Sequence, residues 1–187
     1  MLRRFSRRLS GDRRGASAVE FALLGPVFCL LFAAVVDLGG ALFTKIKLDA
    51  AVAAGVNYAL LNAASANSTS GATLAGNIGS IVATSQGTAW ADNTVVVNHG
   101  PQSTVSGGTA SGSGTAANAD QCYCPTGTST SLSWGTAQTC GAACSGGNTA
   151  YAGKFITISA TRTYTPILST FGLVQNPLTA SATVQVQ

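Results

Sequence analysis

A long apolar segment near the N-terminus constrains this chain more than any other feature. Residues 21–36 contain no charged side chain, and the apolar character continues past Asp37 to Phe43. From Ala16 to Phe43 the stretch exceeds the roughly 20 residues that a helix needs to cross a bilayer. A cleaved secretory signal has a shorter apolar core and a small-x-small exit. The length therefore favours one transmembrane helix over 16–43.

The charges of the chain are concentrated before this segment. Residues 1–15 hold six arginines and one acid, whereas the remaining residues hold four basic and five acidic side chains. The positive-inside rule predicts a cytoplasmic N-terminus and an extracytoplasmic C-terminal body, periplasmic in a bacterium. Because the body itself is not basic, it is not expected to bind nucleic acid.

The side chains that catalysis needs are scarce. His99 is the single histidine of the chain, and only six carboxylates are present. General acid–base chemistry needs such groups in pairs. We therefore predict that the chain is not an enzyme and that it takes no cofactor and no small-molecule substrate.

Glu20 lies at the start of the apolar run. A carboxylate inside a membrane costs about 2–3 kcal/mol on insertion scales, so it should have a partner or a function. The alternative is that Glu20 lies at the interface and meets water.

The order of residues around Glu20 is distinctive. A basic leader ends in Gly15, small residues follow, Glu20 is the fifth residue after the glycine, and Pro26 comes early in the apolar helix. This order resembles the class III signal of type IV pilin-like proteins. The run GASAVEFALLGPVF is similar to the opening of the TadE family, the minor pseudopilins of the tight-adherence (Flp) pilus system. The specific similarity covers residues 13–36.

The resemblance implies a processing and assembly segment. A prepilin peptidase would cut between Gly15 and Ala16, where a residue without a side chain leaves the backbone free to extend. The new amine of Ala16 would pair with Glu20 of a neighbouring subunit, and Phe21 and Pro26 would belong to the same assembly segment. Pro26 would let the helix bend during extraction from the bilayer, or it is an ordinary membrane-helix proline. The implied partners are pilin-like subunits, the inner-membrane pilus assembly machinery and the peptidase.

Beyond the membrane, an apolar residue recurs every four positions from Leu48 to Leu60, which extends the helix to about residue 62. A second short helix is expected up to Gly87, followed by a strand at 94–97. Residues 99–121 contain almost no large apolar side chain, and their composition predicts a mobile surface loop. Period-two alternation predicts two strands near 156–161 and 178–186.

The expected fold is α+β, with a leader (1–15), a membrane helix (16–43), its outer half (44–62) and a head (63–187) that has three or four antiparallel strands.

Four cysteines lie outside the membrane segment, within 122–144. An even number in an exported loop predicts two disulfides. Both pairings that join the two ends of the loop remain open. The alternative is a zinc site with four thiolate ligands, which an oxidising compartment disfavours. The four are Cys122, Cys124, Cys140 and Cys144.

These observations favour a pseudopilin that is processed after Gly15 and takes part in assembly of a tight-adherence pilus, in the inner membrane or at the surface within a pilus. The alternative is a membrane-anchored adhesion or scaffold module that is never cleaved. An anchored enzyme or metal-binding domain is a third hypothesis.

Overall fold

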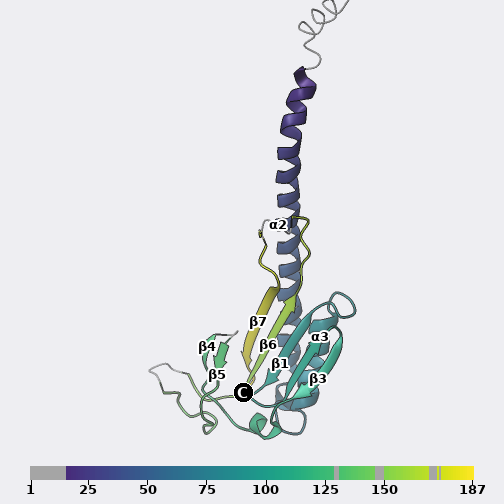
Figure 1. The fold of residues 1–187 in the computed structure, drawn as a ribbon. Coiled ribbons are helices and arrows are strands. Elements are labelled where there is room, and N and C mark those ends of the chain that lie inside the picture. Colours follow the sequence, from purple (N-terminus) through teal and green to yellow (C-terminus); the bar gives the residue numbers. More distant parts are fainter. Residues whose placement is uncertain (1–15, 129–130, 146–149, 169–171, 173) are drawn as a thin grey trace, which may run out of the picture. The chain divides into compact units, whose positions relative to one another are not determined.

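The computed structural model describes residues 16–128, 131–145, 150–168, 172 and 174–187 (Figure 1). The chain divides into two compact units. The first contains the chain up to Ala41 together with Thr165–Val174, and the second contains Leu42–Tyr164 with Gln175–Gln187.

The predicted long helix is confirmed. Helix α2 covers Ala16–Leu61 and ends one residue before the expected boundary. It continues through Pro26, whose missing N–H removes one backbone hydrogen bond. Its residues up to Ala41 belong to the first unit and its later residues to the second.

The second unit is built on an antiparallel sheet with the strand order β3-β2-β1-β6-β7. Figure 1 shows these strands side by side. The inward residues of the central strands pair directly, as in Val95↔Ile158 and Ile158↔Ala182. The α+β prediction is therefore confirmed, with five strands instead of three or four. The strands are β1 (Asp92–Val97), β2 (Gln102–Ser106), β3 (Thr109–Ser113), β6 (Phe155–Arg162) and β7 (Leu178–Gln185).

The two additional strands lie where a loop was expected, so the loop prediction for 99–121 was wrong. Strands β2 and β3 form a hairpin, and a 3-10 helix, η3 (Ala116–Asp120), follows. Strand β2 pairs with β1 and buries Ser103 and Val105 against the helical layer. Backbone pairing with an existing strand thus holds a hydroxyl-rich segment that has little apolar area of its own.

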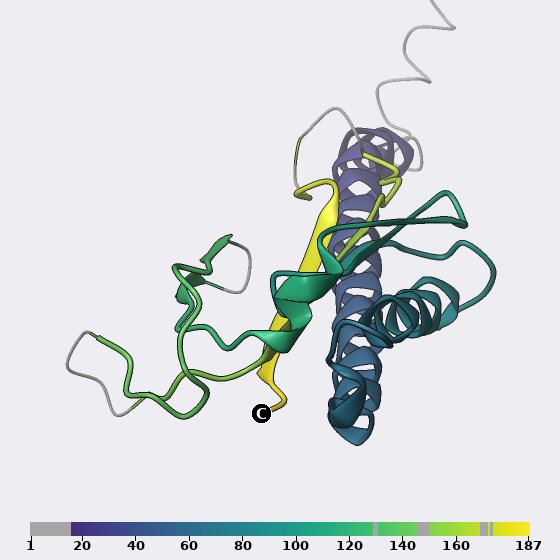
Figure 2. The same cartoon turned by 90° about the horizontal axis from the view of Figure 1, so that it is seen from below.

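The core of this unit lies between the sheet and two helices. Helix α3 (Gly71–Thr84) buries Leu74, Ile78 and Val82, and the outer part of α2 buries Leu48 and Val52. Both helices contribute to one hydrophobic cluster with the inward side chains of β1 and β6. Figure 2 shows α3 beside the outer part of α2.

A smaller cross-linked region follows η3. It contains the two-stranded sheet of β4 (Thr126–Thr128) and β5 (Ser131–Ser133). Isolated bridges connect Cys122 with Gln138 and Tyr123 with Gly153, just before β6. The region is therefore attached to the main sheet through the entry of β6.

Candidate functional site

The predicted processing segment lies at the start of α2. Gly15 lies outside the described residues, and Ala16 is the first residue of the helix. Glu20 is exposed one turn later, and Phe21 beside it is 77% exposed. Within the part of the chain that the structure describes, Glu20 makes no ion pair. The carboxylate therefore lies on the surface of the described part of the chain.

The first unit presents an unusually apolar helix surface. Among the described residues, α2 is the one helix that is long and apolar enough to cross a membrane, and its most apolar window is not buried by the rest of the chain. In water such a surface would be costly, because each large apolar side chain gains about 1.5–3 kcal/mol when it leaves water. The surface therefore fits a lipid environment or neighbouring helices. Its exposed large side chains up to Ala41 are Val19, Phe21, Leu23, Leu24, Val27, Phe28, Leu30, Leu31, Phe32, Val35, Val36 and Leu38.

Pro26 and Cys29 lie within this surface. Helix α2 continues without interruption through Pro26, so the proline does not break the helix in this single chain. Cys29 is a free, exposed thiol. The sequence interpretation of Cys29 as a small apolar side chain is compatible with a lipid-facing position.

Asp37 is a feature of the first unit to which the sequence analysis gave no role. Its side chain is only 1% exposed. The two carboxylate oxygens each accept a backbone hydrogen bond, one from Ile167 N–H and one from Leu168 N–H, both at 2.7 Å. The sequence does contain a signal for this contact. Asp37 is an acid within an apolar run long enough to span a bilayer, and an acid in such a run is expected to have a partner.

Where α2 enters the second unit, its surface changes from apolar to mixed. Lys45 forms an ion pair with Asp49 one turn later, and the ammonium of Lys47 lies 4.5 Å from the ring centroid of Phe43. Exposed pairs of this kind contribute little to stability. They indicate a polar environment around this part of the helix.

The four outer cysteines form two disulfides, Cys122–Cys140 and Cys124–Cys144. This is one of the two pairings across the loop that the sequence left open. Cys122 is fully buried and anchors the region, whereas Cys124 and Cys144 border an open cavity of about 280 Å³. A zinc site would need the same four sulfurs as thiolates, so the two arrangements exclude each other.

An aromatic cluster lies beside the first disulfide. His99 stacks on Trp134 with ring centroids 5.4 Å apart, and Tyr123 meets both rings edge-on. The side chain of His99 is exposed. The cluster nevertheless connects the β1–β2 turn with the cross-linked region. Burial raises the pKa of the Tyr123 hydroxyl.

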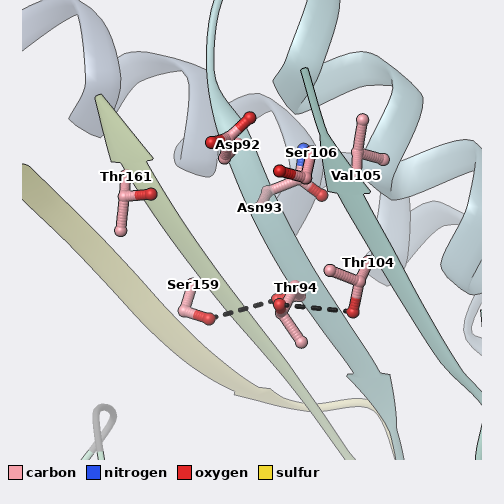
Figure 3. A pocket seen from close by; sticks show the side chains of 8 residues that line it. All are labelled: Asp92, Asn93, Thr94, Thr104, Val105, Ser106, Ser159 and Thr161. Atoms are coloured by element: carbon pink, nitrogen blue, oxygen red, sulfur yellow. Dashed lines mark hydrogen bonds between the residues drawn. The ribbon is translucent and has the colours of Figure 1, made fainter. Parts of the chain in front are cut away.

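The open face of the sheet carries a shallow hollow of about 160 Å³ (Figure 3). Its one carboxylate, Asp92, already accepts a hydrogen bond from the Gly107 N–H in the β2–β3 turn. Thr94 contacts Thr104 at 3.5 Å and accepts a hydrogen bond from the Ser159 hydroxyl through its carbonyl oxygen. The hollow is thus a hydroxyl-lined surface in which Thr94 bonds to both Thr104 and Ser159. It is lined by Asp92, Asn93, Thr94, Thr104, Val105, Ser106, Ser159 and Thr161.

Comparison with known proteins finds similarity to one family, and the similar segment covers most of the long helix. The family model described as TadE-like protein matches residues 15–57. This match confirms the resemblance drawn from the run around Glu20 and extends it into the outer part of α2. Neither a curated protein nor a solved structure shows significant similarity to the chain.

Proposed function

We propose that this chain, through its TadE-like segment, is a minor pilin-like subunit of a tight-adherence pilus. It would reach its place of assembly as a single-pass inner-membrane protein, with the N-terminus in the cytoplasm and the head in the periplasm. The proposal rests on one observation: the family match at 15–57 falls on a single helix with two different parts. The first part is apolar and exposed, and the second part packs into the core of the folded head.

The two parts of α2 support different steps of this function. The exposed apolar part suits a helix that is first stored in a bilayer and then packed against the helices of other subunits, since neither environment offers water. The outer part carries Leu48, Ala51 and Val52 in the core of the head. A pull on the helix during assembly would therefore act on the head through these core contacts.

Processing by a prepilin peptidase between Gly15 and Ala16 is part of the proposal. The cut would free an amine at the first residue of α2, one turn from the exposed Glu20. The amine of one subunit and the carboxylate of the next would form an ion pair away from water. Such a pair costs desolvation and is best suited to fixing the register between subunits.

The N-terminus of the protein in the membrane fraction tests this proposal. Sequencing it should give Ala16 for the wild type, whereas the alternative, an uncleaved anchored adhesion module, predicts Met1. Gly15→Leu should leave the full leader attached, because a bulky side chain precedes the cut. Ser17→Ala, a small exposed residue on the other side of the cut, is the matched control and should be processed normally. An N-terminus at Met1 in the wild type, or normal cutting of Gly15→Leu, would refute the assigned processing site.

A further inference from the structure

We infer that Thr165–Leu168, a described part of the connection between β6 and β7, lies in the outer interface of the lipid bilayer, held there by Asp37. This inference rests on the proposed membrane insertion of α2. The segment belongs to the same compact unit as the apolar part of the helix. In Figure 1 it is the yellow-green segment beside α2.

The position of Asp37 along the helix sets the depth. Glu20 and Asp37 are 17 positions apart in the sequence, which is about 26 Å of helix at 1.5 Å per residue. The hydrocarbon core of a bilayer is about 30 Å thick. With Glu20 at the inner boundary, Asp37 therefore lies close to the outer boundary, among the last apolar residues of the span.

The hydrogen bonds of Asp37 remove the main obstacle to placing a loop at this depth. Irregular backbone is excluded from lipid unless its N–H and C=O groups find partners. The Ile167 and Leu168 N–H groups both donate to the carboxylate of Asp37, and that carboxylate is itself shielded from the surroundings. We call these two hydrogen bonds the Asp37 clasp. Two donors and one anion that would each be costly in an apolar environment satisfy one another.

The side chains around the clasp are suited to lipid. Ile167 is 69% exposed, and Pro166 before it has no N–H to satisfy. On the helix, the neighbours of Asp37 are also exposed and apolar, with Val36 at 56% and Leu38 at 51%. Ile167 thus continues the lipid-facing surface of α2. The occupant of this surface is the outer leaflet, and a neighbouring subunit is the competing occupant.

Fluorescent labelling of single cysteines tests the inference on the full chain. The protein is reconstituted in vesicles of phosphatidylethanolamine and phosphatidylglycerol and labelled with an environment-sensitive nitrobenzoxadiazole probe. Quenching is measured with phosphatidylcholine that carries a nitroxide either near the headgroup or near the chain end. The positions are native Cys29, Ile167→Cys in a Cys29→Ser background, and Ser113→Cys in the same background. Ser113 is exposed and lies at the end of β3 opposite to the end of the sheet where β6 leaves for the connection.

The label at position 167 should be quenched severalfold more than the label at 113, and more by the shallow than by the deep nitroxide. The label at Cys29 should be quenched most by the deep nitroxide. If Cys29 is not quenched, α2 does not span the bilayer and the proposed function fails. If Cys29 is quenched but position 167 behaves like position 113, only the interface inference fails. A blue-shifted but unquenched label at 167 would point to a second subunit and would also overturn it.

The role of Asp37 has its own comparison. Asp37→Ala should lower the quenching at position 167 severalfold, because both loop N–H groups lose their acceptor. Asp37→Asn keeps one acceptor oxygen and should give an intermediate loss. Leu38→Ala, an exposed neighbour without a bond to the loop, should leave quenching unchanged. Equal quenching in Asp37→Ala and Leu38→Ala would show that the clasp does not position the loop.

Discussion

The backbone of Gly55 in α2 lies directly against the side chain of Ile158 in β6. A Cβ atom placed on Gly55 would lie 3.2 Å from Ile158 Cδ1 and 3.1 to 3.2 Å from methyl groups of Val82 and Ile78 in α3. The absence of a side chain at Gly55 thus allows the helix, the second helix and the sheet to meet at one point. A glycine inside a helix costs about 0.5–1 kcal/mol relative to alanine, and this close contact offsets that cost.

Gly55→Leu should therefore destabilise the head by about 1–3 kcal/mol, the usual cost of overpacking a core. The measurement is urea unfolding of the full chain in detergent, followed through the fluorescence of Trp90, which packs against the same core. The matched control is Gly76→Ala in α3, where an added Cβ meets nothing within 4 Å. That control should be neutral or slightly stabilising. An unchanged unfolding midpoint for Gly55→Leu would contradict the close approach of the three elements.

Asp120 connects two distant segments in a pH-dependent way. Its carboxylate accepts a hydrogen bond from Ser68 N–H at 2.9 Å, which ties η3 to the connection between α2 and α3. Hydrogen bonds from the Ser68 side chain and backbone, with a smaller attraction from Lys154, hold the pKa of Asp120 below its ordinary value of 3.8. A lowered folded-state pKa means that the tie is intact above the ordinary value and is lost as the pH falls through the lowered one.

The amide resonance of Ser68 should therefore titrate with a midpoint below pH 3.8. In Asp120→Asn this acid titration of the Ser68 amide should disappear. Because Asp120 is exposed, the global unfolding temperature should change little. A midpoint of the Ser68 titration at or above pH 3.8 would show that the hydrogen bond is not maintained in solution.

The elements with strong periodicity could be predicted from sequence. The four-residue repeat from Leu48 to Leu60 placed the end of α2 within one residue, because Leu48, Val52 and Val56 meet the core. The last residue of the repeat, Leu60, is 47% exposed, and Ala59 beside it is buried instead. The alternation of Ile156 and Ile158 with threonine and serine gave β6 for the same reason. A buried face leaves a period in the sequence whenever the element is regular.

Features that depend on distant partners could not be predicted. Strands β2 and β3 carry few apolar side chains. Backbone hydrogen bonds to β1 hold β2 in the sheet, and those to β2 hold β3. The partners of Asp37 are 130 and 131 residues away in the chain. The disulfide pairing likewise depends on how the loop folds back, which the spacing of cysteines does not determine.

The two disulfides should differ in their contribution to stability. Cys122 is fully buried next to Tyr123, which pairs with Gly153 at the entry to β6, whereas Cys124 lies at the edge of an open cavity. Removing a disulfide typically costs about 2–4 kcal/mol. We expect the Cys122→Ala/Cys140→Ala variant to lose the larger amount and the Cys124→Ala/Cys144→Ala variant the smaller.

Limited proteolysis and the thermal unfolding midpoint measure this difference under non-reducing conditions. Chymotrypsin after Tyr123 and elastase between Cys140 and Cys144 would separate the two linked peptides, so mass spectrometry also reports the pairing. Equal losses in the two variants would contradict the anchoring role of Cys122. Peptides that link Cys122 to Cys144 would contradict the pairing itself.

Glu20→Ala should spare membrane insertion and processing but impair assembly. The carboxylate is exposed at the start of α2, so its removal leaves the fold of the single chain intact. In the assembly, however, the amine of a neighbouring Ala16 would lose its partner, and an unpaired charge away from water costs about 3–5 kcal/mol.

The yield of pili from Glu20→Ala cells, measured by shearing and electron microscopy, should fall severalfold. Glu20→Gln, which keeps the shape and removes the charge, should fall to the same degree, whereas exposed Val19→Ala should not. Full piliation in Glu20→Gln would show that a charge pair at this position is not what fixes the register of the subunits.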